Sequence, residues 1–225
     1  MIEKITINKH SSIRIQGDKV IYFDPYEIEE ETHDADVIFI THDHYDHFDP
    51  ASINKILRDD TLLVIPGSCF EAWSDSGIIS TQVVEMEPGQ TMDIYGMVIE
   101  TVPAYNVMKH YHPRRNEWLG YIVTFEGRRI YVAGDTDLTE ESKEVRCDIA
   151  FVPVGGKYTM TPGKAAELVN IIHPDIAVPT HYGSVAGKPG DGRLFKSMVD
   201  DGIIVTLLIR HKAEEEEAAA EDIEE

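Results

Sequence analysis

Short apolar segments separated by turn residues run through the first half of the chain and predict a series of strands. A Gly-Asp pair at 17–18 separates two such segments and is typical of a hairpin turn, so the flanking strands should pair antiparallel. Ile53, Ile56 and Leu57 are spaced as on one face of a helix, which predicts a helix over 50–58. The strands are predicted at 4–7, 12–16, 20–23, 36–40 and 62–65.

The second half continues the alternation of strands and turns and adds two helices. Thr161 is a good N-cap and Pro162 suits the first helical position, which predicts a helix continuing to about residue 172. Residues 192–199 predict a second helix, and the Glu-Gly pair at 126–127 predicts a hairpin turn. The strands are predicted as three segments between 82 and 102, and at 121–125, 129–132, 149–154, 176–178 and 203–209.

Neither a fixed-period repeat nor a Gly/Ser-rich linker divides the chain, so these elements predict one domain over 1–212. Their order predicts an α+β fold in which two mainly antiparallel sheets pack together with helices outside, an αββα sandwich. The remaining residues, 213–225, hold eight acids and no base. Such a composition is typical of a solvated tail without a catalytic role.

The chain carries a formal net charge of −21. A charge of this sign and size opposes binding to nucleic acids and to anionic membranes. No segment approaches the ~20 apolar residues of a membrane span, and the N-terminal residues MIEKITINKH lack the apolar stretch of a signal peptide. We therefore expect a cytoplasmic protein that acts on a small molecule, and whether it forms a homo-oligomer stays open.

The sequence THDHYDH, directly after the predicted strand at 36–40, contains three imidazoles and two carboxylates in seven positions. Nitrogen and oxygen donors at this density are typical of a site for divalent cations. Because residues two apart in an extended segment point to the same side, His42 and His44 can bind one ion together. Asp46 and His47 lie further along and can face a second ion. The alternative is a solvated polar loop.

Two later strands also end near a residue that can bind a metal. Asp135 follows the strand at 129–132, and His181 follows the strand at 176–178. Taken alone, Asp135 is equally typical of a turn or a helix cap, and His181 is no more specific. Since donors at several strand ends can meet at one edge of a sheet, we expect both side chains near the histidine-rich loop.

The motifs THDHYDH, AGDTD and PTHYG, in this order, resemble those of the metallo-β-lactamase superfamily. The segment FVPVGGKYTM and the DP of YFDP resemble its branch of uncharacterised metal-dependent hydrolases, which is similar to ascorbate-phosphate lactonases and N-acyl phosphatidylethanolamine phospholipases. The resemblance implies an αββα fold with two internally similar halves. The ligands it implies are His42 and His44 for the first metal, Asp46, His47 and His181 for the second, and Asp135 as the bridge.

One position departs from this family pattern. Many relatives place a third histidine for the first metal where this chain has Asn106. His110, His112 or water can complete the first metal instead, and we favour His112 because a residue before proline is held in extended backbone. A surface or supporting role for His112 is equally open. Zinc is the expected ion at both positions, and manganese or iron fits the same donors.

The chemistry expected of two divalent cations is hydrolysis by a hydroxide that bridges them, because such ions lower the pKa of water from about 15.7 toward about 7. We assign direct roles in this reaction to Asp46, His112 and Tyr158. Asp46 would orient the nucleophile while it binds metal. Tyr158 would donate a hydrogen bond to the leaving group.

A basic loop at 109–116, inside an otherwise acidic chain, favours a small anionic substrate with an ester, lactone or phosphodiester bond. Lys109 and Arg114 in this loop, together with Lys157 in the loop before Tyr158, are the candidate substrate-binding residues. The alternative is an exposed loop whose charges serve solubility.

The sequence also leaves other functions open and suggests residues that support the metal ligands. A non-catalytic metal-binding or regulatory protein on the same fold is the main alternative, motivated by Asn106 and the acidic tail. Diiron relatives with redox activity usually carry Glu where His44 stands, which argues against that chemistry. Asp24 and Thr136 are candidates for orienting metal ligands, and His10 resembles an early histidine of the branch. Each of these three also suits a structural role.

Overall fold

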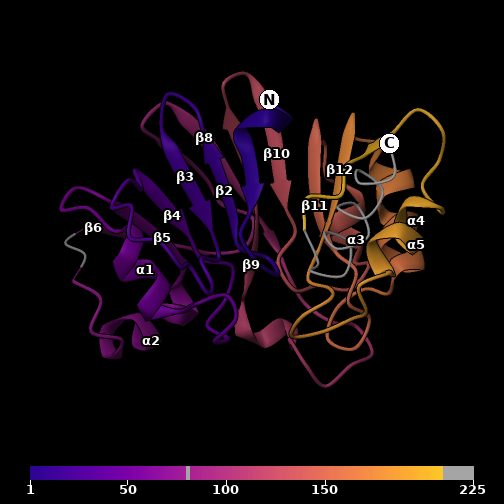
Figure 1. Cartoon of the computed structure of the whole chain (residues 1–225). Helices are drawn as coiled ribbons and strands as arrows, with labels where there is room; N and C mark the ends of the chain where they lie inside the picture. Colours follow the sequence, from indigo (N-terminus) through magenta and orange to yellow (C-terminus); the bar gives the residue numbers. More distant parts are fainter. Residues whose placement is uncertain (80–81, 210–225) are drawn as a thin grey trace, which may run out of the picture.

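The computed structural model describes residues 1–79 and 82–209, and shows two β-sheets packed face to face with helices on both outer sides (Figure 1). Helices α1 (Pro50–Ile56) and α2 (Phe70–Asp75) lie on the left of the view, and α4 (Pro162–Ile172) and α5 (Asp191–Lys196) lie on the right. This four-layer arrangement confirms the predicted αββα sandwich. The short helical segments are α3 (Glu140–Lys143) and the 3₁₀ turns Ile2–Lys4, Gly67–Cys69 and Arg114–Asn116.

The first sheet contains six strands in the order of the chain. β1 and β2 pair antiparallel, as do β2 and β3, whereas β3, β4, β5 and β6 run parallel to their neighbours. The strands are β1 (Ile5–Ile7), β2 (Ile13–Gln16), β3 (Val20–Phe23), β4 (Val37–Phe39), β5 (Leu62–Pro66) and β6 (Gln82–Met86).

The second sheet contains seven strands, also in chain order. The strands from β7 to β10 pair antiparallel, and those from β10 to β13 pair parallel. They are β7 (Thr91–Ile94), β8 (Met97–Pro103), β9 (Leu119–Phe125), β10 (Arg128–Val132), β11 (Ile149–Pro153), β12 (Ile176–Thr180) and β13 (Ile204–Val205).

Both sheets are therefore mixed, and the prediction that they are mainly antiparallel was wrong. The helices explain the difference, because each lies in the connection between two neighbouring parallel strands: α1 joins β4 to β5, α3 joins β10 to β11, and α4 joins β11 to β12. A connection through a helix returns the chain to the same end of the sheet, so the next strand runs parallel. The hairpins predicted at 17–18 and 126–127 are present.

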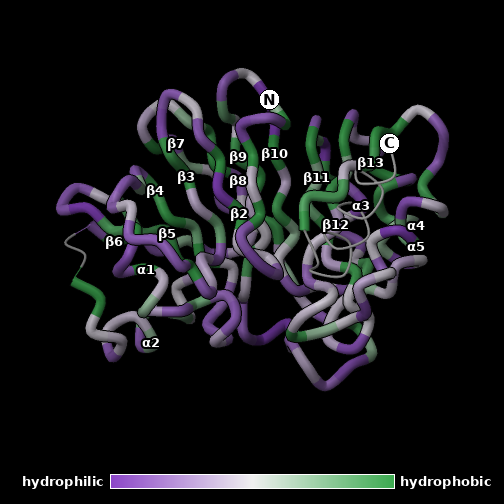
Figure 2. Tube along the Cα trace, in the orientation of Figure 1, coloured by the Kyte–Doolittle hydropathy of each residue, from purple (hydrophilic) through white to green (hydrophobic). Residues whose placement is uncertain are grey.

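The core lies between the sheets and under the helices. Phe23 and Phe39 of the first sheet stack with ring centroids 4.8 Å apart, and Tyr121 of the second sheet lies 5.3 Å from Phe39. A second apolar cluster places Ile53 and Ile56 of α1 on the outer face of the first sheet. Figure 2 shows the same division, with hydrophobic residues concentrated along the strands and hydrophilic residues in the loops.

Several elements differ from the sequence prediction in their bounds or were not predicted. The closing strand predicted at 203–209 is limited to the two residues of β13, and α2 and α3 were not predicted because each spans only a few residues. The predicted acidic tail at 213–225 lies outside the described residues. Within the part of the chain that the structure describes, no helix has the length and apolar character needed to cross a membrane.

The parallel strands bring several strand ends together. β8, β10, β11 and β12 share one direction, because β8 and β10 are both antiparallel to β9 and the other two are parallel to β10. In the first sheet β3 and β4 likewise share a direction. Ligands of mixed α/β sheets bind beyond the carboxyl ends of such strands. Every candidate metal ligand in the sequence follows one of these ends or begins the loop that faces them.

Candidate metal centre

The histidine-rich loop begins at the end of β4 and is fastened to both sheets. The Thr41 N–H donates to Asp24 Oδ1 at 2.8 Å, and the Tyr121 hydroxyl of the second sheet donates to the Ile40 carbonyl at 2.8 Å. The loop then turns, with the His47 N–H donating to the His44 carbonyl at 2.9 Å. These bonds hold the imidazoles on a rigid support at the carboxyl edge of the strands.

Three imidazoles form the first cluster, which we call the histidine triad: His42, His44 and His112. Nδ1 of His44 lies 3.0 Å from Nε2 of His42 and 3.2 Å from Nε2 of His112. Nitrogens that share a tetrahedral zinc at about 2.0–2.1 Å lie about 3.3 Å apart, so the triad has the spacing of three ligands of one ion. His42 and His112 are buried, and His44 is more exposed.

Four residues form the second cluster, which we call the mixed cluster: His10, Asp46, His47 and His181. Asp46 Oδ2 lies 3.2 Å from His10 Nε2 and 3.8 Å from Nε2 of both His47 and His181. All four side chains are buried, and their ligand atoms lie within 4.8 Å of one another. His10 thus joins a group of potential ligands, which its sequence context alone did not show.

Asp135 lies between the two clusters. Its Oδ2 is 3.2 Å from His112 Nε2 of the triad and 2.9 Å from His181 Nε2 of the mixed cluster. Its Oδ1 is 3.3 Å from His47 Nε2. A single carboxylate therefore contacts both groups of histidines, which is the position of a bridging ligand.

Several potential metal-binding atoms of the site are buried and make no hydrogen bond, which favours a bound cation. Among the described residues, the buried His47 Nε2, Asp135 Oδ1 and His10 Nε2 have no hydrogen-bond partner, although they face other polar atoms. Buried polar atoms left without partners cost free energy, so proteins rarely keep them unless an ion or water satisfies them. Imidazole nitrogen and carboxylate oxygen are ordinary ligands of zinc, manganese and iron.

Asp24 and Thr41 orient the ligands from behind. Asp24 Oδ2 lies 2.7 Å from His47 Nδ1, which leaves Nε2 of that ring for the cluster. The Thr41 hydroxyl donates to Asp24 Oδ2 at 2.7 Å and can therefore accept from His42 Nδ1, 3.0 Å away. A histidine whose Nδ1 carries the proton presents Nε2 as the ligand. The structure thus places Asp24 where the sequence suggested, behind the ligands.

Burial keeps His42 and His44 of the triad neutral. It lowers the pKa of His42 well below its ordinary value, and the charge that His47 carries lowers it further. Burial likewise lowers the pKa of His44, with His112 as the next contributor. Neutral imidazole is the form that binds metal, so His42 and His44 are in the form that binds an ion at neutral pH.

The mixed cluster has a different charge state. Burial opposes a charge on His47, but the carboxylates of Asp135, Asp24 and Asp46 outweigh it and raise its pKa to about 9. Burial also opposes ionisation of Asp46, yet its pKa is lowered to about 2, chiefly by the His10 imidazole beside it. In the metal-free protein, His47 is therefore protonated at neutral pH, and a cation must displace that proton.

Four residues of the site adopt a backbone conformation that non-glycine residues rarely use. The φ angles are 57° for His10, 45° for Asp24, 53° for His112 and 57° for His181. Such strain persists where the surrounding structure requires it, and it clusters at functional sites. The extended backbone expected for His112 before proline is therefore wrong, although the prediction of its place beside His42 and His44 agrees with the geometry.

Two glycines let the strand ends approach. A Cβ on Gly134, which has a φ of 65°, would lie 2.9 Å from the Leu119 carbonyl oxygen and 3.1 Å from Thr41 Cβ. A Cβ on Gly155 would lie 2.3 Å from the His181 carbonyl oxygen. The absence of these side chains lets the segment before Asp135 approach the loop after β4, and lets the segment after β11 approach His181.

Asn106 supports His112 at close range. Its N–H donates to the His112 carbonyl at 2.8 Å, and its Nδ2 lies 3.2 Å from His112 Nδ1 and donates to the Tyr158 carbonyl at 2.6 Å. His110 is exposed and belongs to none of the ligand groups found among the described residues. Trp118, which the sequence analysis did not consider, packs its ring 4.8–5.3 Å from the three triad rings.

The candidate substrate-binding cations differ in their surroundings. Lys109 pairs with Asp137 and donates to the Thr159 carbonyl at 2.6 Å. Arg114 pairs with Glu141 at 2.6 Å. Lys157 is exposed, has no acidic partner among the described residues, and places its Nζ 4.7 Å from the centroid of the Tyr158 ring. The charges of the first two are thus neutralised within the fold, whereas that of Lys157 is not.

Thr136 stabilises the turn after β10 through hydrogen bonds of its hydroxyl. Its hydroxyl donates to the Tyr105 carbonyl at 3.1 Å and accepts from the Tyr105 N–H at 3.2 Å. It therefore ties the segment after β10 to the segment after β8, and it touches neither cluster directly. This contact agrees with the structural role that the sequence left open.

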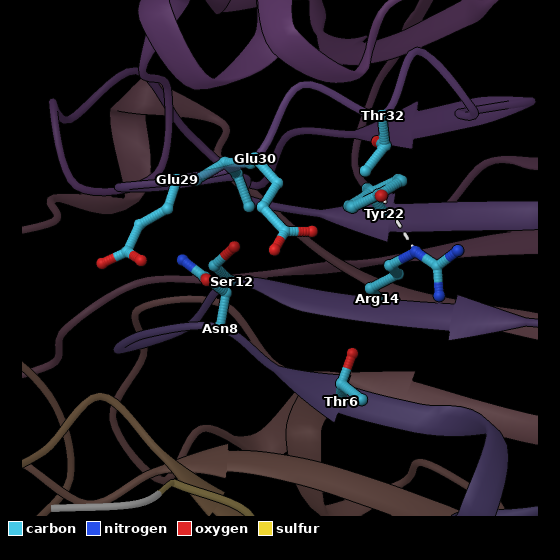
Figure 3. A pocket seen from close by; sticks show the side chains of 9 residues that line it. Thr6, Asn8, Ser12, Arg14, Tyr22, Glu29, Glu30 and Thr32 are labelled. Carbon is cyan, nitrogen blue, oxygen red and sulfur yellow. Dashed lines mark hydrogen bonds between the residues drawn. The ribbon is translucent and has the colours of Figure 1, made fainter.

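A hollow of about 460 Å³ opens elsewhere, on the outer face of β1 to β3 (Figure 3). Arg14 on its wall donates to the Tyr22 hydroxyl at 2.9 Å and to Asp34 at 2.6 Å. The charge of this arginine is therefore already compensated. The ligand groups found among the described residues lie at the strand ends and not in this hollow.

Fold and site together define an αββα metal-binding architecture, with two groups of histidines and carboxylates at the carboxyl ends of the strands. Residues 4–181 match the family model described as a beta-lactamase superfamily domain. The chain belongs to the metallo-β-lactamase superfamily.

Proteins with similar sequences or structures cover nearly the whole chain. A UPF0173 metal-dependent hydrolase of Thermoplasma volcanium is 30% identical over 224 residues, covering 94% of this chain and 97% of the relative. A crystal structure of a metal-dependent hydrolase from Parabacteroides distasonis is 34% identical, with a TM-score of 0.77 and coverage of 92% and 93% of the two chains. The narrower similarity to ascorbate-phosphate lactonases and N-acyl phosphatidylethanolamine phospholipases stays a prediction.

A more distant structure shows how widely the fold is shared. CmlA, a diiron β-hydroxylase from Streptomyces venezuelae, has a TM-score of 0.71 at 15% identity, over 92% of this chain and 52% of that one. This likeness concerns the fold alone. The chemistry has to be argued from the side chains of the site.

Proposed function

We propose that this chain, a metal-dependent hydrolase of the metallo-β-lactamase superfamily, is dinuclear and cleaves an ester, lactone or phosphodiester bond in a small molecule that carries an anionic group. The histidine triad would bind one cation, and the mixed cluster would bind the other. Zinc suits the imidazole-rich donors, and manganese or iron fits them as well.

The observation that carries the proposal is the position of Asp135. Its two oxygens contact histidines of both clusters, at 3.2 Å from His112 and at 2.9 and 3.3 Å from His181 and His47. One carboxylate between two separate groups of ligands is what a paired-metal site needs. A site for a single ion would leave one of the two groups of buried histidines without a purpose.

Divalent cations at this place would lower the pKa of water and polarise the bond to be cleaved. Asp46 would accept a hydrogen bond from the attacking water and orient it, since a carboxyl with a pKa of about 2 is a weak base at neutral pH. Tyr158 would donate a hydrogen bond from its hydroxyl to the leaving group. Lys157 beside it would pair with the anionic group of the substrate.

Lys109 and Arg114 take a supporting role in this proposal. Their ion pairs with Asp137 and Glu141 hold the loop that carries His112 against the segment after β10. Pairing them instead with a substrate would require breaking these contacts. We therefore assign recognition of the anion to Lys157 first.

The test begins with the full chain loaded with zinc and assayed for metal content. We expect two equivalents of zinc and turnover of at least one substrate among simple lactones, aryl esters and bis(p-nitrophenyl) phosphate. Asp135→Ala should lose activity by about a thousandfold or more, because it removes the ligand that both clusters share. Asp59→Ala, at an exposed carboxylate, is the matched control and should behave as the wild type. A protein that binds two ions and turns over none of these substrates would contradict the proposal.

A further inference from the structure

Four tyrosines adjoin residues of the site in the chain or contact them, and we call them the tyrosine collar: Tyr26, Tyr45, Tyr111 and Tyr158. Tyr45 lies between His44 and Asp46 in the chain, and Tyr111 directly precedes His112. The other two reach the site through contacts. The Tyr26 ring centroid is 6.5 Å from that of His10, and the Tyr158 carbonyl accepts a hydrogen bond from Asn106.

The collar consists of two aromatic pairs. Tyr26 and Tyr45 meet edge to face with centroids 6.1 Å apart, and Tyr111 and Tyr158 do so at 4.7 Å. Tyr45 belongs to the loop after β4 and Tyr158 to the loop after β11, so each pair includes a ring from a loop at the strand ends. Edge-to-face contact occupies the edge of one ring and leaves much aromatic surface uncovered.

The exposure of the collar is high for aromatic side chains. Tyr45 is 66% exposed and Tyr111 is 46% exposed. Two more apolar side chains of the same loop as Tyr111 are exposed, Val107 at 58% and Met108 at 90%. Apolar surface gathered at the rim of a site commonly marks the place where a ligand binds. Packing of the loops alone does not account for a ring as open as that of Tyr45.

The cations near Tyr111 and Tyr158 differ in their partners. The ammonium of Lys157 lies against the Tyr158 ring, and the neighbouring Lys109 and Arg114 are neutralised by acids of the fold. The charge of Lys157 can therefore pair with an anionic group of a substrate.

We infer that the substrate carries an aromatic or flat apolar group, which the tyrosine collar binds while the bond to be cleaved reaches Asp135 and the two clusters. This inference rests on the proposed function, since it names the class of substrate for the same site. The rings supply the contact with the apolar body, and Lys157 supplies the contact with the anion.

The experiment compares two probes that differ only in the group the collar would hold, phenylphosphonate and methylphosphonate. Both present the same anion and neither is hydrolysed. Calorimetric titration of the zinc-loaded full chain should show phenylphosphonate binding about tenfold more tightly, as expected for a favourable aromatic contact. In Tyr45→Ala and Tyr111→Ala the ratio of the two affinities should fall to about twofold. Tyr45→Phe should keep the ratio, because it keeps the ring.

Tyr95→Ala is the matched control, since Tyr95 is 51% exposed in the turn between β7 and β8 and lies outside the collar. Zinc content is measured for every variant, so a loss of metal is distinguished from a loss of ring contact. Equal affinity of the two probes for the wild type, or a ratio unchanged in both alanine variants, would overturn the inference. Failure of the proposed function shows separately, as a lack of turnover in a protein that still binds both probes.

Discussion

The histidine triad and the mixed cluster lie side by side but differ in composition, exposure and charge. The triad contains imidazoles only, and one of them, His44, is partly exposed. The mixed cluster includes the Asp46 carboxylate, is buried throughout, and receives further negative charge from Asp24 behind His47. The Asp135 carboxylate contacts histidines of both groups.

This difference indicates unequal tasks for the two positions. In the proposed function, the neutral imidazoles of His42 and His44 can bind a cation without releasing a proton, and the partial exposure of His44 leaves that position open to substrate. The mixed cluster surrounds its position with buried carboxylates that favour a positive charge, at first the proton of His47 and then a metal ion. The triad is therefore suited to exchange and substrate contact, and the mixed cluster to firm retention.

The most direct test of the difference between the two clusters is to remove one ligand of the triad. His112→Ala should release one of the two zinc ions and lower activity by about a hundredfold or more, because two remaining imidazoles no longer hold the ion in tetrahedral geometry. The mixed cluster should keep its ion. Metal content by elemental analysis and turnover of the best substrate are the measurements.

His110→Ala is the matched control for that variant. His110 lies two residues away in the same loop and is exposed. It should keep both ions and full activity. Loss of an ion in His110→Ala, with both ions kept in His112→Ala, would reverse the assignment of the third triad ligand.

Much of this comparison could be predicted from the sequence. The residue types and spacing of the motif after β4 predicted a metal site. Asp135 and His181 each follow an apolar strand, which predicted that they lie at the same edge of the sheet as that motif. Asp24 was recognised as a candidate partner because it ends a strand. Local patterns were sufficient wherever ligand, strand and turn lie close together in the chain.

The remainder depends on contacts that no local pattern records. His10 enters the mixed cluster only because the first sheet folds against the loop after β12, where the His181 N–H donates to the His10 carbonyl. The positive φ of His112 results from tertiary contacts that override the preference of a residue before proline. The internal ion pairs of Lys109 and Arg114 involve acids 28 and 27 residues away, so composition alone suggested free charges.

A second test removes the negative charge behind the mixed cluster. Asp24→Asn should weaken zinc binding at the mixed cluster by about 10–100-fold, the usual cost of losing a partner that orients a metal-binding histidine. Binding at the triad should change little, since Asp24 touches His47 directly and the triad only through Thr41. Competition with a chelator of known affinity resolves the two binding steps.

Asp34→Asn is the matched control for Asp24→Asn. Asp34 accepts hydrogen bonds from Arg14, Tyr22 and Thr32 on the outer face of the same sheet. Its loss should lower stability without altering either zinc affinity. Equal weakening of both binding steps in Asp24→Asn would show that the two positions are not supported separately.

The charge on His47 leads to the smallest expected effect, a dependence of stability on pH. The pKa of His47 is raised from 6.5 to about 9 in the folded, metal-free protein. Its protonation therefore stabilises the fold fully below pH 6.5, and this contribution is lost as the pH rises toward 9. The pKa values of His10 and His42 are lowered by burial, so their effects fall below this window. Zinc binding has the opposite trend, because it requires neutral His47.

We therefore expect the melting temperature of the chelator-treated protein to fall between pH 6.5 and 8.5, while the increase in melting temperature caused by zinc grows over the same range. Scanning calorimetry at several pH values, with and without metal, measures both trends. Both melting-temperature trends should depend less on pH in Asp24→Asn, since this variant lacks one of the carboxylates that raise the pKa of His47. A zinc increment that stays constant across this range would contradict the assignment of the buried proton to the mixed cluster, and with it the contrast between the two positions.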